Sequence, residues 1–220
     1  MSVLMKFPRP LATFRQLSKV GPSVNTLRRA WLAAATITCL ISLAGPALAQ
    51  GAPKVKFVTS EGDFVVEVYP DKAPKTVENF LQYVKDKYYD GTIFHRVINN
   101  FMVQGGGFDA SYAQKPTRAP VVHEGREALA KGGDKNVLGT LAMARTNEPN
   151  SASSQFFINV KDNDFLNPTP QSYGYTVFGK VVSGMDVVNK IKSVPTGAAG
   201  PFRSDVPKTP ILIKSATLVN

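Results

Sequence analysis

The stretch KVKFVTSEGDFVVEVY, from Lys54 to Tyr69, alternates apolar and polar residues on either side of a short polar turn. Alternation with a period of two is typical of β-strands that bury one face. The turn, Glu61-Gly62-Asp63, contains a glycine, which readily adopts the backbone angles of a tight reversal. The stretch therefore predicts a β-hairpin, and it favours a mainly β protein.

Further short strands are predicted along the rest of the chain. Residues 92–97 and 101–105 have strand-like patterns and are separated by a turn at Asn99-Asn100. Four more apolar stretches have the same character: LGTLAMA, SQFFINV, YTVFGKVV and the C-terminal PILIKSATLVN. The predicted strands and helices do not alternate along the chain, so the pattern does not indicate a doubly wound sheet. Many short strands with few helices predict an antiparallel barrel or sandwich with helices at its ends.

The segment from Ala73 to Tyr89 has apolar residues at helical spacing, and Pro74 stands near its start. Proline is well tolerated in the first turn of a helix, so the segment predicts an amphipathic helix with one buried face. The residues expected on that face are Val77, Phe80, Leu81, Val84 and Tyr88.

A second, shorter helix is predicted at residues 184–192, where Met185, Val188 and Ile191 recur every three residues. In contrast, residues 109–136 are polar and contain several prolines and glycines. That composition predicts a long surface loop.

Residues 1–49 differ from the rest of the chain. The first 29 residues carry six positive charges and no acid, and an apolar run follows from Ala30 to Gly45. Gly45-Pro46 then breaks any helix, and Ala47-Leu48-Ala49 supplies small residues. This order is typical of a secretory signal peptide cleaved after Ala49, which leaves one domain at residues 50–220. An uncleaved membrane anchor is the alternative, because about 20 apolar residues can span a bilayer.

The net charge of +10 belongs largely to this N-terminal segment. Without its six positive charges, the domain carries about +4. The remaining basic residues are scattered among 16 acids, so no nucleic-acid partner is expected. The only cysteine, Cys39, would leave with the signal, and His95 and His123 are the only histidines. With no thiol and no metal-ligand spacing, we expect neither a cysteine nucleophile nor a metal or other cofactor.

The stretch FHRVINNFMVQGGGFD, from Phe94 to Asp109, mixes residues that suggest a functional site. Its glycines do not form a phosphate-binding loop, because no Gly-Lys-Ser/Thr follows and no helix opens after them. They are better interpreted as allowing a bulge or a close backbone approach at a strand end. His95 has no nucleophile or orienting acid visibly tied to it, which favours a structural role. In a strand, His95 and Arg96 would face opposite sides, so at most one would readily reach a given site.

Together with LAMARTNEPNSASSQFF and YTVFGKVVSGMDVV, this stretch resembles the cyclophilin family of peptidyl-prolyl cis-trans isomerases, and most of all its exported bacterial members. The resemblance covers residues 54–219, with the motifs in the family's order. It implies a closed eight-stranded antiparallel β-barrel capped by two α-helices. It also implies a periplasmic, monomeric isomerase without a cofactor that assists folding. Its partners would be proline-containing unfolded or flexible polypeptides, and it would meet the membrane only through its signal segment.

The resemblance also assigns the site, with Arg96 as the catalytic residue. Arg145 stands where many eukaryotic members have asparagine, so only its backbone role carries over. Phe165 replaces a common tryptophan and lacks the indole N–H donor, so we expect weak binding of cyclosporin. Tyr175 stands where many members have histidine, and it keeps a ring with a polar tip. The implied substrate-binding residues are Phe101, Met102, Gln104, Ala144, Arg145, Gln155, Phe157, Phe165, Leu166 and Tyr175.

Rotation about an Xaa-Pro bond needs no nucleophile, which fits the absence of one. The barrier arises from amide resonance and amounts to about 18–20 kcal/mol. In the twisted transition state the prolyl nitrogen regains a lone pair, and a donor such as the Arg96 guanidinium would bind it better than the planar ground state. Two other functions stay open: a peptide-holding chaperone of the same fold with little catalysis, and an exported β-barrel for a small apolar ligand. The presence of Arg96 and Gln104 favours the enzyme over the first, and the many Phe and Met residues favour a filled interior over the second.

Overall fold

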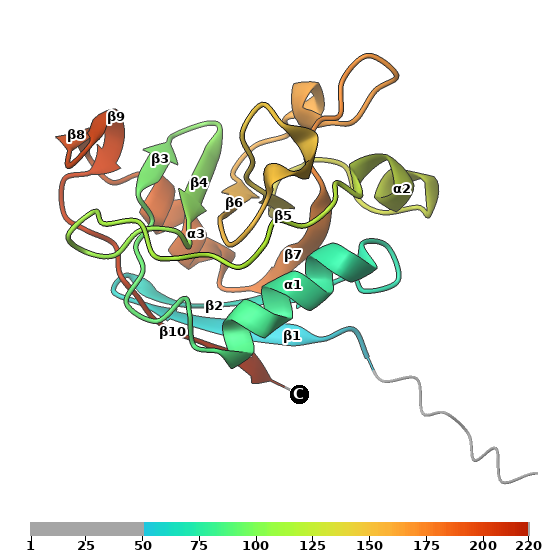
Figure 1. Ribbon diagram of the computed structural model, residues 1–220. Coiled ribbons are helices and arrows are strands. Elements are labelled where there is room, and N and C mark those ends of the chain that lie inside the picture. Colours follow the sequence, from blue (N-terminus) through green and yellow to red (C-terminus); the bar gives the residue numbers. More distant parts are fainter. Residues whose placement is uncertain (1–50, 220) are drawn as a thin grey trace, which may run out of the picture. The chain divides into compact units, whose positions relative to one another are not determined.

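A curled antiparallel sheet of eight strands organises residues 51–219, the part of the chain that the computed structural model describes (Figure 1). The predicted signal segment lies outside these residues. The spatial order is β10-β1-β2-β7-β5-β6-β4-β3, so neighbours in the sheet are often distant in sequence. The strands are β1 (Lys54–Thr59), β2 (Gly62–Val68), β3 (Arg96–Ile98), β4 (Met102–Gly105), β5 (Thr140–Met143), β6 (Phe156–Asn159), β7 (Val177–Ser183) and β10 (Ile213–Val219).

The predicted hairpin of residues 54–69 is confirmed as β1 and β2. Their register runs from Lys54 opposite Glu67 to Thr59 opposite Gly62. Alternate residues of both strands are buried, so the period of two that predicts the hairpin also decides which face meets the core.

The sheet does not close into the predicted barrel. The edge strands β10 and β3 form no ladder with each other within the described residues. Three backbone hydrogen bonds bridge part of the gap, from Gly91 N–H to Ile213 O (2.9 Å), from Phe94 N–H to Ile211 O (3.0 Å) and from Ile213 N–H to Thr92 O (2.7 Å). The Ile93 N–H instead donates to Phe108 O at 2.9 Å. These contacts include only an isolated bridge and no ladder, so the predicted strand 92–97 shortens to β3 and the sheet remains an open, curled half-barrel.

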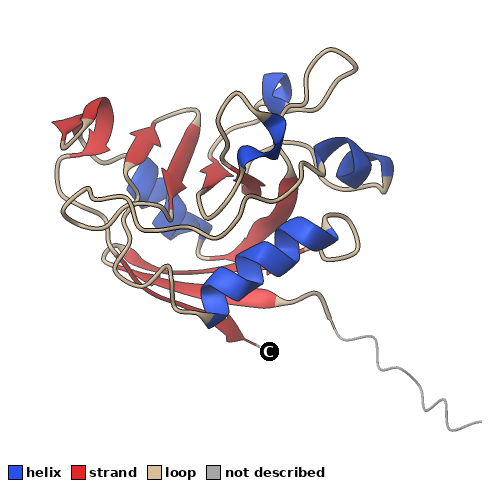
Figure 2. Ribbon diagram, in the orientation of Figure 1, coloured by secondary structure: helices blue, strands red, loops and turns tan. Residues whose placement is uncertain are grey.

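Between residues 51 and 219, three α-helices accompany the sheet, rather than the predicted two. The predicted helices are confirmed as α1 (Pro74–Lys85) and α3 (Met185–Lys192). The third, α2 (Gly125–Ala130), interrupts the long connection between β4 and β5 that the sequence predicts as loop throughout (Figure 2). A helix of six residues is too short for an apolar period to reveal it.

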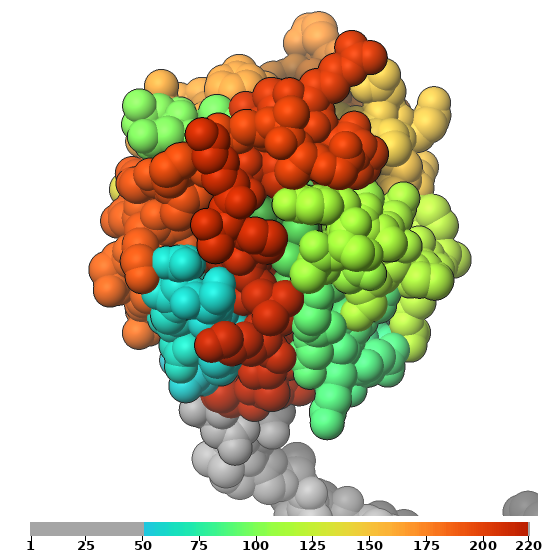
Figure 3. All heavy atoms as spheres, turned by 90° about the vertical axis from the view of Figure 1, so that its left-hand side faces the viewer, coloured from blue at the N-terminus to red at the C-terminus, as the bar shows by residue number. Residues whose placement is uncertain are grey.

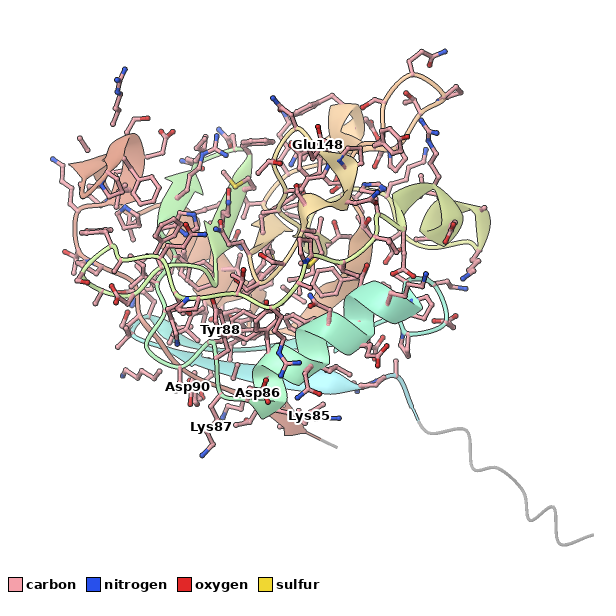
Figure 4. The ribbon with its side chains drawn as sticks, in the orientation of Figure 1. Lys85, Asp86, Lys87, Tyr88, Asp90 and Glu148 are labelled. Atoms are coloured by element: carbon pink, nitrogen blue, oxygen red, sulfur yellow. The ribbon has the colours of Figure 1, made fainter. Side chains whose placement is uncertain are left out.

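Helix α1 ends earlier than its apolar pattern predicts. Lys87 adopts a left-handed backbone conformation (φ 53°), which stops the helix one turn before Tyr88. Figure 4 shows Lys85, Asp86 and Lys87 together at this end. Tyr88 nevertheless packs against the core, and its hydroxyl donates to Lys115 O at 3.1 Å.

The first turn of α1 is capped by a carboxylate from elsewhere in the chain. Ala73 precedes the helix and has no side-chain acceptor for the free N–H groups. Glu124, which is 2 % exposed, accepts hydrogen bonds from the N–H groups of Lys75 (3.1 Å) and Thr76 (2.7 Å). It also accepts one from the Thr76 hydroxyl at 2.7 Å. The polar connection that contains Glu124 is therefore part of what holds α1 in place.

Aromatic side chains fill the space between the sheet and the helices. Phe57 lies 5.0 Å from Phe64, 5.4 Å from Phe156 and 6.3 Å from Phe80 between ring centroids. All four are essentially buried and belong to one large cluster. The prediction of a filled interior is thus confirmed, and such an interior leaves no room for the small apolar ligand of the alternative function.

The remaining elements are short. A hairpin of β8 (Thr196–Ala199) and β9 (Phe202–Pro207) forms a separate two-stranded sheet, and η1 (Pro149–Ser151) and η2 (Asp164–Leu166) are single 3₁₀ turns. None of the helices between residues 51 and 219 is both long and apolar enough to cross a membrane.

Candidate active site

Strands β4, β5 and β6 are buried on both faces, and each face contributes to a different cluster. Val103, Leu141 and Ile158 point to the large aromatic core. Their neighbours Met102, Ala142 and Phe157 point the opposite way and form a second cluster with Leu166 and Val177. Side chains alternate along a strand, so the apolar runs of these strands build a core on one side and a site on the other.

Register aligns the site residues in a row across four strands. Arg96 on β3 pairs with Gln104 on β4, and Gln104 pairs with Phe157 on β6. Phe157 in turn pairs with Ala142 on β5. Directly opposite residues face the same side of a sheet at a spacing of about 4.8 Å, so the basic, amide and apolar groups of this row lie next to one another.

A cavity of about 350 Å³ opens above this row. Ten of the eleven predicted site residues line this cavity. Three further residues that were not predicted as site residues also line it: His95, Phe108 and Phe202. Met102, Phe157 and Leu166 are nearly buried and form an apolar floor. The predicted residues that line the cavity are Arg96, Phe101, Met102, Gln104, Ala144, Arg145, Gln155, Phe157, Leu166 and Tyr175.

Phe165 is the predicted residue that the structure places outside the cavity lining. Its side chain is 72 % exposed and stacks on Phe101, with 5.6 Å between the ring centroids. Phe165 sits on η2 directly before Leu166, which turns inward. Phe165 therefore supports the outer wall through Phe101.

Gln104 and Gln155 are joined by a hydrogen bond from Gln104 Nε2 to Gln155 Oε1 at 2.9 Å. The glycines beside them leave the room that this pair needs. A Cβ on Gly107 would lie 2.5 Å from the Gln155 side chain, and Gly106 has a positive φ (81°) with the Tyr89 ring 2.8 Å from where its Cβ would be. The prediction that these glycines serve close backbone approach is confirmed.

Only a backbone role is predicted for Arg145, but its side chain also makes contacts that shape the cavity. Its Nε donates to Gly174 O at 2.9 Å, and its Nη1 donates to Thr146 O at 2.7 Å. The guanidinium also lies over the Tyr175 ring, 4.8 Å from the centroid. Tyr175 packs edge-on against Phe157 at 5.5 Å, so Arg145 holds one wall of the cavity in position.

A network of buried asparagines holds the backbone next to the site. Asn163 Nδ2 donates to Phe101 O at 2.9 Å and to Asn159 Oδ1 at 2.7 Å. Asn136 Nδ2 donates to Leu166 O at 3.2 Å, and Asn159 Nδ2 donates to Asn136 Oδ1 at 3.2 Å. The network fixes the backbone at two cavity residues, and buried amides satisfied in this way specify one arrangement.

His95 and Arg96 both line the cavity, so the prediction that only one of them reaches a common site is wrong. His95 precedes β3 and is not part of a regular strand, so strand alternation does not apply to it. Its ring packs against Phe108 (4.7 Å) and Phe202 (5.4 Å), and it is 3 % exposed. Burial, assisted by the charge of Arg96, lowers the pKa of His95 to about 4. The ring is therefore neutral at pH 7, which agrees with the predicted structural role.

Arg96 itself is exposed at the cavity rim. None of the ion pairs formed within residues 51–219 involves it. A second hollow of about 200 Å³ adjoins the cavity and shares Gln104, Ala144, Arg145 and Gln155 with it. No cluster of three or more His, Cys, Asp or Glu side chains within the described chain is arranged to hold a metal.

Sequence reasoning missed Phe108 and Phe202 as site residues. Phe108 follows the glycine run directly, and that position was its only signal. Phe202 comes from a hairpin almost a hundred residues later, with nothing in its local pattern to connect it to Arg96.

Comparison with known proteins bears on what the cavity does. Residues 54–218 match the family described as cyclophilin type peptidyl-prolyl cis-trans isomerase/CLD. Peptidyl-prolyl cis-trans isomerase B of Escherichia coli K12 is 54 % identical over 167 residues, which are 74 % of this chain and 98 % of that protein. A peptidyl-prolyl cis-trans isomerase of Acinetobacter baylyi is 52 % identical over 164 residues, 74 % of this chain and 84 % of that protein.

Solved structures agree with the sequence matches. A cyclophilin type peptidyl-prolyl cis-trans isomerase of Cryptosporidium parvum superposes with a TM-score of 0.61 at 27 % identity, over 77 % of this chain and 98 % of that one. A second structure of that protein, in the presence of the dipeptide Ala-Pro, gives a TM-score of 0.60 over 76 % of this chain and 99 % of that one. With the match spanning residues 54–218 and isomerases as its relatives, the chain belongs to the cyclophilin-type peptidyl-prolyl cis-trans isomerases.

Proposed function

We propose that the chain isomerises Xaa-Pro bonds by a non-covalent mechanism in which Arg96 donates a hydrogen bond to the prolyl nitrogen. One observation carries the proposal: the Arg96 guanidinium, unpaired with any acid of the described residues, lines the same cavity as the apolar floor of Met102, Phe157 and Leu166. The proline ring would rest on this floor. Support for such a ligand comes from the Cryptosporidium parvum relative, whose structure was solved in the presence of Ala-Pro.

Arginine suits this step because it remains charged and holds its donors in a rigid fork. It binds the pyramidal nitrogen of the twisted state and finds no lone pair on the planar amide, so the interaction is made mainly in the transition state. No proton moves, and the neutral His95 beside Arg96 is not required as an acid or base.

The hydrogen bond alone is too weak to account for strong catalysis. Five orders of magnitude in rate correspond to about 7 kcal/mol, whereas a charge-assisted hydrogen bond contributes about 1.5–3 kcal/mol in ordinary surroundings. The apolar floor would supply part of the difference, because planar amide resonance separates charge and is favoured by water. Excluding water from the bond therefore raises the energy of the planar state relative to the twisted one.

The linked pair Gln104–Gln155 and the backbone at Ala144 and Arg145 would hold the peptide on one side of the proline. With one side fixed, rotation is confined to the other. The second hollow, which these residues share with the main cavity, lies where the held part of the peptide would pass.

The test is NMR exchange between cis and trans forms of an Ala-Pro peptide. Wild type should accelerate exchange, and Arg96→Ala should lower kcat/KM by at least about tenfold, the value of a charge-assisted hydrogen bond. Arg96→Lys keeps the charge but loses the fork, and should recover only part of the rate. Arg126→Ala removes an exposed arginine outside the cavity and serves as the matched control. Equal acceleration of cis-trans exchange by wild type and Arg96→Ala would rule out the proposed role of Arg96.

We further propose that the isomerase is exported to the periplasm, where it assists folding of proline-containing polypeptides as a monomer. The basic and apolar segments of residues 1–49 and the small residues before Gln50 support export. Mass spectrometry of the protein recovered from a periplasmic fraction should find Gln50 as the first residue. Recovery of an uncleaved chain from membranes would contradict the proposal.

A further inference from the structure

The cavity continues beyond the proline floor into an aromatic compartment. Phe108 and Phe202 meet edge-on at 5.0 Å, and both contact the His95 ring. Neither phenylalanine belongs to the two buried clusters of the described chain, and both are half-buried. Their rings therefore present apolar surface to the cavity that internal packing does not use. We refer to His95, Phe108 and Phe202 as the aromatic wall.

The β8–β9 hairpin holds Phe202 firmly in this position. Gly200, at the tip, has a positive φ of 53°, and a Cβ there would lie 2.6 Å from the Tyr112 side chain. At the base, Val206 is 1 % exposed and Lys208 N–H donates to Pro195 O at 2.9 Å. Figure 3 shows the hairpin, in orange-red, against the yellow-green segment that follows β4. A residue held at both ends of its hairpin is preorganised and loses little entropy when a ligand binds.

The aromatic wall stands one residue away from the proposed donor. His95 directly precedes Arg96, and both side chains line the same cavity as Phe108 and Phe202. One residue of an extended peptide advances about 3.3–3.6 Å. With the prolyl nitrogen at Arg96, the side chain of a residue next to the proline lies within reach of the wall. A cavity of about 350 Å³ is also larger than one proline ring fills.

We propose that the aromatic wall is a specificity subsite for a large apolar side chain on a residue adjacent to the substrate proline. The inference rests on the proposed placement of proline beside Arg96. A lysine side chain is disfavoured there, because Arg96 and Arg145 both line the cavity. An aspartate would have to give up its hydration against three rings, at a cost that one arginine at the rim only partly offsets.

The experiment measures kcat/KM by NMR exchange for short peptides in which the residue before or after proline is Leu, Gly, Asp or Lys. At one of the two positions, wild type should prefer Leu over Gly by about tenfold, the discrimination that an apolar pocket provides. Phe202→Ala should reduce this ratio to within about twofold, and Phe108→Ala should reduce it as well. Arg203→Ala, an exposed position on the same hairpin, should leave the ratio at the wild-type value.

Circular dichroism establishes that each variant is folded. If Phe202→Ala does not fold, the test relies on Phe202→Leu and Phe108→Ala instead. A wild-type enzyme that treats Leu and Gly alike at both positions overturns the inference, and so does a ratio that survives the loss of either ring. The Leu/Gly selectivity ratio tests the subsite, whereas the rate with Arg96→Ala tests the donor mechanism. If Arg96→Ala keeps full activity while Phe202→Ala loses selectivity, the donor mechanism is wrong and the subsite is supported.

Discussion

Arg96 and His95 are neighbours in sequence, yet their side chains lie in very different environments. Arg96 is exposed at the rim, whereas His95 packs against two phenylalanine rings and has a buried Nδ1 with no hydrogen-bond partner in the described chain. A charged imidazole would be costly there, so folding keeps His95 neutral. The conspicuous histidine of the motif thus contributes shape, and the arginine contributes the charge.

The stability of the protein should depend on pH through His95. Its pKa is about 4 in the folded state and 6.5 when unperturbed. Above pH 6.5 both states are neutral and the full stability is present. As the pH falls towards 4 the unfolded state takes up the proton first, so stability is lost, by about 3 kcal/mol in all. Urea midpoints measured across this pH range should show the loss.

His95→Phe isolates the effect, because a phenyl ring can pack against Phe108 and Phe202 as the imidazole does but does not titrate. His123, whose pKa is also lowered by burial, remains in both proteins and cancels in the comparison. The variant should therefore lose less stability than wild type between about pH 6.5 and pH 4. Parallel curves would show that His95 is not the titrating group.

Phe165 is the predicted site residue that turned outward, and this sharpens the expectation for cyclosporin. An exposed phenyl ring that stacks on Phe101 offers apolar contact but no hydrogen-bond donor. Phe165→Trp restores an indole N–H at this position and should tighten binding about three- to tenfold, the range of one net hydrogen bond of about 0.5–1.5 kcal/mol. Calorimetric titration of both proteins measures the change, and an unchanged Kd would show that the missing donor is not responsible.

At the scale of elements, the sequence predicts best where a period is long and one face is buried. The β1–β2 hairpin, α1 and α3 all have such patterns, and all three are present. Helix α2 and the β8–β9 hairpin are too short and too polar to show a period, so neither was predicted. The predicted closure of the sheet is wrong, because residues 92–94 meet residues 211–213 only through an isolated bridge, and an apolar pattern does not show how far a ladder extends.

Helix α1 depends on Glu124, which comes from the connection predicted as a surface loop. The buried carboxylate accepts three hydrogen bonds from Lys75 and Thr76. Glu124→Ala should lower the free energy of unfolding by about 2–3 kcal/mol, since donors at a buried helix start would be left unsatisfied. Glu124→Gln keeps one acceptor oxygen and should cost less.

Urea unfolding measures these changes, with Glu127→Ala as the matched control. Glu127 is an exposed acid on α2, three residues further on, and its removal should change stability by less than about 0.5 kcal/mol. Equal midpoints for Glu124→Ala and Glu127→Ala would contradict the capping role.

At the scale of the whole molecule, one face of the sheet packs against the aromatic core and the other face lines the cavity. The apolar runs of β4, β5 and β6 predict buried strands, but they do not reveal that β4 pairs with β6 or that Arg96 and Gln104 lie opposite each other. Both pairings depend on the order of the strands in the sheet, which a single sequence leaves open. Only the family resemblance therefore predicted that the ten residues now found in the cavity lining belong to one site. Phe202 shows the limit of that resemblance, since it reaches the cavity through a separate hairpin.

The domain boundary expected after Ala49 leads to the last prediction. All described elements lie between Lys54 and Val219, and these residues form one compact unit. A chain that begins at Gln50 keeps both the aromatic core and the complete cavity lining. It should therefore unfold in a single transition and isomerise an Ala-Pro peptide with kcat/KM within about twofold of the full chain, as expected of an autonomous domain. Removing residues 50–59 as well deletes β1, a central strand that pairs with β10 and β2, and should abolish folding. A truncated chain from Gln50 that fails to fold would show that the N-terminal segment belongs to the domain.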